Sequence, residues 1–223
     1  MRDRKLLRRE ADGTLVTHAD LSSWATGHAN DMAVDAAARA YVGNFGFGLM
    51  SGAPLETASL HRVDPDGTVT EVAADLWFPN GTVITPDNVL IVNETFGNRS
   101  TAFDLTDDGR LINHRTWAEF APLPTGRAMD QMFSQLEVAG DGCCLDSGGA
   151  LWIADADNAR LLRVTEGGKI TEEIDPGSPV YACALGGADG RTLFACAAPD
   201  FFEQARSTAR EASLLAIPSP VPA

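Results

Sequence analysis

The chain carries a repeated pattern of short β-strands. Four segments alternate apolar and polar residues on both sides of an Asp-Gly or Gly-Gly pair. They start at Leu6, Leu60, Ala102 and Leu161, with turn pairs at Asp12, Asp66, Asp108 and Gly167. Such alternation is typical of strands with one buried face, and these pairs supply the positive φ angles that a tight hairpin needs. We therefore predict four β-hairpins in this series.

A second series of hairpins alternates with the first. Its members start at Asn30, Asn80, Asp141 and Tyr181. In each, the second strand is almost continuously apolar, as in VLIVNE and ALWIAD, which is typical of a fully buried strand. Two alternating hairpins make a four-stranded unit that recurs about every 40–60 residues, the sequence pattern of a β-propeller. We predict an all-β propeller with about four to five blades in this chain.

The same pattern sets the expected domain organisation. Residues 1–217 are predicted to form a single, incomplete propeller domain, followed by a Pro-rich tail at 218–223. The irregular spacing of the repeats places extra residues in loops at 46–59 and 118–137. A helix is expected only at 201–215.

Charge and composition narrow the classes of partner. With 31 acidic against 17 basic residues the net charge is −14, which repels phosphate backbones, so we expect no nucleic-acid partner. No apolar run reaches the roughly 18–20 residues of a membrane span, and the N-terminal segment lacks the apolar stretch of a signal peptide. We expect no membrane association and a cytoplasmic location; the oligomeric state stays open.

The four cysteines fit that location. They are Cys143, Cys144, Cys183 and Cys196, all inside apolar runs and none in a Cys-x-x-Cys pair. Buried free thiols are therefore expected rather than a disulfide framework or a zinc site.

Three of the second-series hairpins open with a carboxamide or a carboxylate. If their first strands line the propeller axis, Asn30, Asn80 and Asp141 converge there, and their oxygen atoms suit a hard cation such as Ca²⁺ or Mg²⁺. The fourth hairpin opens with Tyr181 and offers no hard ligand. The alternative interpretation is that the Asn-Gly and Asp-Gly pairs are ordinary turn dipeptides.

The ordered segments GHANDMAVDAAARAYVGN, SLHRVDPDGTVTEVAADLWFPNGTVITPDNVLIVNET and DGCCLDSGGALWIADADNARLLRV resemble the SMP-30/gluconolactonase/luciferin-regenerating enzyme family over nearly the whole chain. The resemblance implies a six-bladed propeller with a divalent metal in its channel, most often Ca²⁺, with Mg²⁺, Mn²⁺ or Zn²⁺ as alternatives. It also implies hydrolysis of sugar lactones as the activity, with a small-molecule lactone as the partner.

The resemblance assigns roles to individual residues. It places the metal-binding Asn on Asn80, the metal-binding Asp on Asp141, and the substrate-facing Asn on Asn30. His28 stands where some members carry a substrate-contacting Arg, and Asp141 is also the candidate catalytic base.

The family's third metal ligand is a Glu in an N-terminal Glu-Gly-Pro segment, which has no counterpart here. The chain is therefore expected to be truncated at its N-terminus. Two functions follow as alternatives: a metal-dependent lactonase, or a noncatalytic propeller fragment or pseudoenzyme that binds a small molecule or a partner.

Overall fold

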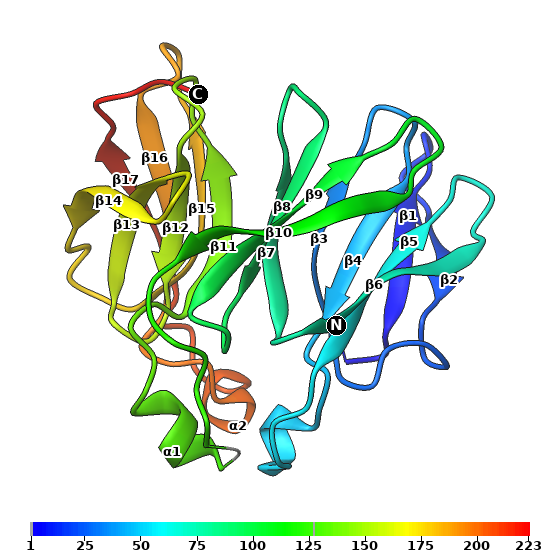
Figure 1. Cartoon of the computed structure of the whole chain (residues 1–223), viewed down its shortest axis with the longest axis horizontal. Coiled ribbons are helices and arrows are strands. Elements are labelled where there is room, and N and C mark those ends of the chain that lie inside the picture. The colour runs from blue at the N-terminus through cyan, green and yellow to red at the C-terminus, as the bar shows by residue number, and fades with distance from the viewer. Residues whose placement is uncertain (1, 127) are drawn as a thin grey trace.

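The computed structural model describes residues 2–126 and 128–223. These residues form antiparallel sheets arranged as the blades of a propeller (Figure 1). Three sheets have four strands, one has three and one has two. The predicted all-β propeller fold is therefore confirmed.

The strands follow one another along the chain, blade by blade. The two-stranded sheet contains β1 (Lys5–Arg9) and β2 (Leu15–Asp20). The next contains β3 (Ala29–Val34), β4 (Ala40–Asn44), β5 (Ala58–Val63) and β6 (Val69–Leu76). The third contains β7 (Pro79–Ile84), β8 (Val89–Glu94), β9 (Arg99–Leu105) and β10 (Leu111–Glu119). The fourth contains β11 (Gly140–Leu145), β12 (Leu151–Asp155), β13 (Arg160–Thr165) and β14 (Lys169–Ile174). The fifth contains β15 (Val180–Gly186), β16 (Thr192–Ala197) and β17 (Ser213–Pro218).

Both predicted hairpin series are present. The first series forms the pairs β1–β2, β5–β6, β9–β10 and β13–β14. The glycines of its turns have positive φ, for example 88° at Gly13 and 90° at Gly167, a conformation that costs glycine little. The second series forms β3–β4, β7–β8, β11–β12 and β15–β16.

The first strands of the second series lie side by side at the centre of the molecule. β3 contacts β7, β7 contacts β11, and β11 contacts β15. The approach of β7 to β11 is so close that a Cβ on Gly81 would lie 2.2 Å from the Asp141 carbonyl oxygen. The strands that follow them, β4, β8 and β12, are almost entirely buried, as the apolar runs predict.

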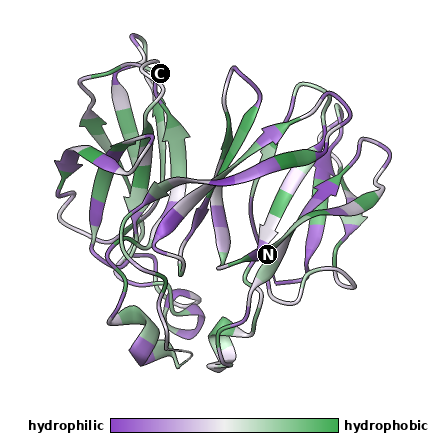
Figure 2. Ribbon diagram, in the orientation of Figure 1, coloured by the Kyte–Doolittle hydropathy of each residue, from purple (hydrophilic) through white to green (hydrophobic). Residues whose placement is uncertain are grey.

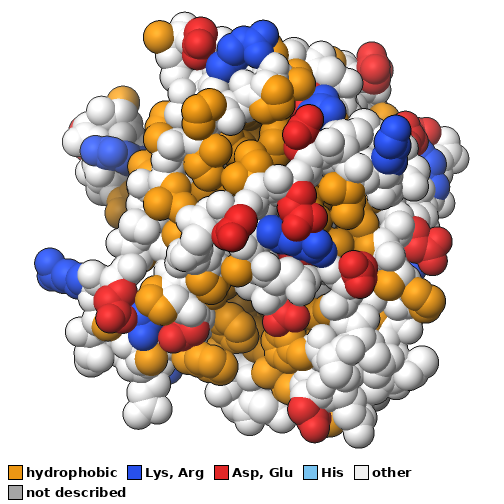
Figure 3. Space-filling model, turned by 90° about the vertical axis from the view of Figure 1, so that its left-hand side faces the viewer, with side chains coloured by type: hydrophobic (Ala, Val, Ile, Leu, Met, Phe, Trp, Pro, Cys, Tyr) orange, Lys and Arg blue, Asp and Glu red, His pale blue; other side chains and the backbone are white. Residues whose placement is uncertain are grey.

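The hydrophobic core lies between neighbouring sheets. One cluster joins the third sheet to the fourth through Ile91, Trp117, Leu151 and Ile153, and Figure 2 shows hydrophobic stretches running through the strands. The excess of acidic residues is not gathered in one patch on the face drawn in Figure 3, where Asp and Glu side chains are scattered. Within the described residues, no helix is long and apolar enough to span a membrane.

The prediction of a helix at 201–215 is wrong. Only a single turn, α2 (Glu203–Arg206), is helical, and Ser213–Pro218 form β17 instead. The reason is tertiary: β17 pairs along its whole length with β16, and Leu215 and Ile217 pack on the core of the fifth sheet. The expected long loops join β4 to β5 and β10 to β11, and they hold a 3₁₀ turn, η1 (Leu49–Ser51), and α1 (Met129–Phe133).

All four cysteines are free, but the expectation that they are buried is confirmed only for Cys183. Cys143 and Cys144 are half-buried, and Cys196 is exposed. Alternate residues of β16, Leu193, Ala195 and Ala197, face the core, so Cys196 points to the opposite face of the sheet.

Candidate functional site

A cavity of about 460 Å³ opens at one end of the central strands. Its lining comes from the beginnings of the inner strands and from the segments that follow the second strands, together with η1, α1 and α2. These three helical turns all lie at one end of the molecule (Figure 1). The volume is within the range of small-molecule sites.

A β-bulge recurs at the same position of every inner strand. The strand register shifts between Ala29 and Met32, Pro79 and Thr82, Gly140 and Cys143, and Val180 and Ala182. Each bulge contains at least one side chain that borders the cavity: Asn30 and Asp31 in β3, Asn80 in β7, Asp141 in β11 and Tyr181 in β15. A bulge bends the strand and redirects its side chains, which explains how four repeats present carboxamide, carboxyl and phenol groups to one space.

The interpretation of Asn-Gly and Asp-Gly as turn dipeptides is wrong for these positions. Asn80 and Gly81 lie inside β7, and Asp141 and Gly142 lie inside β11. The glycines are there because neighbouring backbone leaves no room: a Cβ on Gly142 would lie 2.8 Å from the Ala182 Cα.

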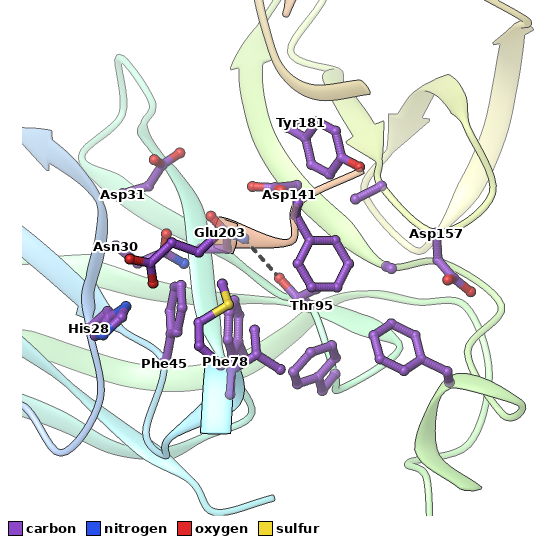
Figure 4. Close-up of a pocket in the computed structure, with 18 of the residues that line it drawn as sticks. His28, Asn30, Asp31, Phe45, Phe78, Thr95, Asp141, Asp157, Tyr181 and Glu203 are labelled. Carbon is purple, nitrogen blue, oxygen red and sulfur yellow. Dashed lines mark hydrogen bonds between the residues drawn. The ribbon is translucent and has the colours of Figure 1, made fainter. Parts of the chain in front are cut away.

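The hydrogen bonds around Thr95 fix the orientation of the Asn80 side chain. The Thr95 hydroxyl donates its single proton to the Gly140 carbonyl at 2.8 Å, so it must accept the bond of 3.0 Å that joins it to Asn80. The atom facing Thr95 is therefore Asn80 Nδ2, and Figure 4 draws this bond as a dashed line. Asn80 Oδ1 is left buried without a hydrogen-bond partner, which is unusual for a buried oxygen.

Asp141 carries the most strongly shifted carboxyl group of the site. Burial, and then the charge of Asp31, raise its pKa to about 8, although hydrogen bonds from the Gly142 backbone and the Asn80 side chain act in the opposite direction. Desolvation by the surrounding protein also raises the pKa of Asp31, although part of its side chain is exposed in the cavity. Two carboxyl groups thus share this part of the cavity, and the charge of Asp31 raises the pKa of Asp141.

The two residues expected to contact substrate border the same cavity. Asn30 Nδ2 donates to the Pro79 carbonyl at 3.3 Å, which leaves Oδ1 to accept a bond from a ligand. His28 packs against Phe45, with ring centroids 5.4 Å apart. The structure thus brings together His28, Asn30, Asn80 and Asp141 (Figure 4 labels all but Asn80), while their roles stay predictions.

The donor set suits a hard cation in its chemistry. The orphaned Asn80 Oδ1 and the Asp141 carboxylate are oxygen ligands of the kind that Ca²⁺ and Mg²⁺ prefer. Among residues 2–126 and 128–223 no group of three or more His, Cys, Asp or Glu side chains is arranged to hold a metal ion.

Several lining residues are not among the predicted site residues. Tyr181 occupies the same bulge position as the three predicted residues, so the repeat itself was a sufficient signal; burial raises its pKa. Asp157 and Glu203 also border the cavity. Burial raises the pKa of Asp157, and Glu203 is paired at 2.5 Å with Arg2.

The comparisons with known proteins identify the family. A family model described as "SMP-30/Gluconolactonase/LRE-like region" matches residues 1–198. The chain belongs to this family. A 6-deoxy-6-sulfogluconolactonase of Pseudomonas putida is 30% identical over 137 residues, which make up 60% of this chain and 43% of that protein. The match thus spans less than half the length of that curated relative.

Solved structures of similar proteins share the fold. A luciferin-regenerating enzyme superposes with a TM-score of 0.74 at 18% identity, covering 99% of this chain and 73% of that one. The calcium-binding protein regucalcin of Agrobacterium tumefaciens gives a TM-score of 0.71 at 20% identity, covering 99% and 72%. A gluconolactonase of Xanthomonas campestris gives 0.67 at 26% identity, covering 88% and 63%.

Proposed function

We propose that this chain hydrolyses sugar lactones with the help of a divalent cation held by Asn80 and Asp141. The observation that carries the proposal is the buried Asn80 Oδ1, which has no hydrogen-bond partner and borders the same cavity as Asp141. Membership of the family supports the reaction class, as do the gluconolactonase of Xanthomonas campestris and the sulfogluconolactonase of Pseudomonas putida.

Each residue has a definite task in this proposal. Asn80 and Asp141 would hold the cation, which would supply polarisation of the lactone carbonyl and stabilisation of the negative charge that develops on its oxygen. The ionised Asp141 accepts a proton from the attacking water. Asn30, with Nδ2 engaged by Pro79, accepts a hydrogen bond from a substrate hydroxyl through Oδ1. Water adds to the carbonyl carbon, the ring C–O bond breaks, Asp141 passes the proton that it took from the water to the departing ring oxygen, and the product is the open-chain hydroxy acid.

Ca²⁺ is the first choice of cation, because carboxamide and carboxylate oxygens with added water suit its flexible coordination. Mg²⁺, Mn²⁺ and Zn²⁺ are the alternatives. Since only one of the two residues is charged, we expect a weak site, because affinity rises with the number of charged ligands.

The test is a substitution that removes the charge but keeps the shape. Chelator-treated protein should acidify a δ-gluconolactone solution faster than the spontaneous hydrolysis only after a divalent cation is added, and Asp141→Asn should lower this catalysed rate by about 100-fold or more. Calorimetry should show that the same variant binds the cation weakly. Asp87→Asn, at an exposed turn between β7 and β8, is the matched control and should behave as the original protein.

Two results would contradict the proposal. One is full activity in the presence of chelator. The other is the absence of both turnover and cation binding in the original protein, which would favour a noncatalytic propeller that binds a small molecule or a partner.

A further inference from the structure

One wall of the cavity is made of phenylalanine rings. Phe45, Phe78, Phe96 and Phe133 follow one another in ring contact, with centroid separations of 4.4, 4.6 and 5.6 Å. They come from the segments after β4, before β7 and after β8, and from α1. Figure 4 shows the rings of Phe45 and Phe78 on the side of the cavity away from Asp31 and Tyr181. The site therefore has a polar side and a continuous aromatic side.

The central ring of this wall is held by a strained backbone. Phe78 has φ 62°, a left-handed conformation that bulky residues rarely adopt because it is strained. Neighbouring main-chain bonds hold it in place: the Thr95 N–H donates to the Phe78 carbonyl, and the Phe96 N–H donates to the Trp77 carbonyl, both at 3.2 Å. Glycine would adopt this positive φ without strain. A phenylalanine stands there instead, and its ring lines the cavity.

The charges at the rim disfavour an anionic ligand. Four carboxyl groups border the cavity, those of Asp31, Asp141, Asp157 and Glu203. Among the described lining residues the one guanidinium is Arg2, and it is already paired with Glu203. A divalent cation offsets two of the negative charges and leaves no positive surplus for a carboxylate, sulfonate or phosphate substituent.

We infer that the site takes an uncharged lactone whose ring carries an apolar alkyl or aryl substituent. The substituent lies on the phenylalanine wall, where burial of its surface drives binding, and the lactone carbonyl lies at Asn80 and Asp141. This inference rests on the cation-dependent lactone hydrolysis proposed above and goes beyond it in the substrate: alkylated or deoxygenated rings are favoured over the polyhydroxylated sugar lactones and over anionic ones.

The first experiment compares three lactones that share a six-membered ring. They are δ-decanolactone with an alkyl chain, δ-gluconolactone with hydroxyl groups, and the 6-sulfonated gluconolactone with a negative charge. Because each buried CH₂ contributes about 0.8 kcal/mol, partial burial of the chain should raise kcat/KM for δ-decanolactone at least about tenfold over δ-gluconolactone. The sulfonated compound should be the poorest substrate. A preference for either sugar lactone would overturn the inference.

Substitutions at the rim test whether the wall is the cause. Phe133 is only partly buried, on the single-turn α1, so Phe133→Gln should fold and should reduce the preference for δ-decanolactone about tenfold, whereas Phe133→Leu should keep it. Phe194→Gln is the matched control, since Phe194 is also half-buried but lies on β16 outside the cavity. An unchanged preference in Phe133→Gln would contradict the role of the wall.

Binding separates this inference from the proposed function. The six-membered lactam with the same alkyl chain resists hydrolysis, and its binding to chelator-treated protein can be followed by calorimetry. If no lactone is hydrolysed, the proposed function fails, yet tighter binding of the alkyl lactam than of the unsubstituted lactam, lost in Phe133→Gln, would still support an apolar site. Equal binding of both lactams would overturn it.

Discussion

At the scale of single residues, the site depends on Thr95, which contacts no substrate in the proposed reaction. Its hydroxyl has one proton, and because that proton goes to the Gly140 carbonyl, Asn80 must turn its NH₂ group toward Thr95 and its oxygen away. Thr95 is thus a positioning residue for Asn80 Oδ1.

Removal of the Thr95 hydroxyl should therefore weaken the binding of a divalent cation. Thr95→Val keeps the shape but removes the hydroxyl, so the Asn80 amide loses the acceptor that holds its NH₂ group toward Thr95 and keeps only its hydrogen bond to Asp141. Divalent-cation affinity measured by calorimetry should fall about 10- to 100-fold, as for other groups that orient a ligand. Thr95→Ser keeps the hydroxyl and should bind the cation as the original protein does. Equal affinity in Thr95→Val would show that the amide is oriented by something else.

The sequence predicts some residues of the site and gives no indication of others. Asn30, Asn80 and Asp141 were found because they recur at one position of a repeat and carry oxygen ligands. Tyr181 recurs at the same position, but a phenol is a poor ligand for a hard cation, so the repeat does not predict a metal ligand there. Phe78 had no signal at all, since its place in the wall depends on one left-handed backbone angle that a non-glycine residue does not reveal.

At the scale of elements, the recurring bulge decides the geometry of the site. Without a bulge, Asn80 and its neighbour would alternate between the two faces of the sheet, and the inner strands would not present these polar side chains to the cavity. The bulged strands also lie very close together, because Gly81 permits contact with the backbone of β11.

A side chain at Gly81 should disrupt the packing of β7 against β11. A Cβ at this position would lie 2.2 Å from the Asp141 carbonyl oxygen and 2.8 Å from the Cys143 nitrogen, so Gly81→Ala must push β7 away from β11. We expect the free energy of unfolding to fall by roughly 1–3 kcal/mol, as for other overpacked positions, and cation binding to weaken with it. Gly186→Ala in β15 is the control, because the nearest atom to its Cβ would be 3.4 Å away. Urea denaturation of both variants decides the matter, and equal stability of the two would contradict the argument.

Pairing between strands explains why the helix expected at 201–215 is largely absent. The Ala, Glu, Gln and Arg residues of 203–211 favour helix formation locally, but the chain from Ser213 pairs with β16 and buries Leu215 and Ile217. Strand pairing was predictable elsewhere because alternation and turn glycines both lay in the local sequence. For β17 the deciding contact is with a partner strand that local propensity does not describe.

At the scale of the whole molecule, the raised pKa of Asp141 makes the free energy of unfolding depend on pH. Burial and the charge of Asp31 raise the pKa of Asp141 from 3.8 to about 8, so between these values the folded, cation-free protein binds more protons than the unfolded chain. The free energy of unfolding must then decrease as the pH rises through this window. Since one pKa unit corresponds to about 1.4 kcal/mol, the loss between pH 4 and pH 8 should be on the order of a few kcal/mol.

Urea denaturation at pH 5 and pH 8 in the presence of chelator measures this effect directly. Asp141→Asn cannot ionise at this position, so its stability should fall much less over the same range. A divalent cation should reverse the trend, because it binds the ionised carboxylate and stabilises the folded state more as the pH rises. If stability in chelator instead increased from pH 5 to pH 8 and Asp141→Asn did not alter the slope, Asp141 would not be the uncompensated buried carboxyl on which the proposed cation site depends.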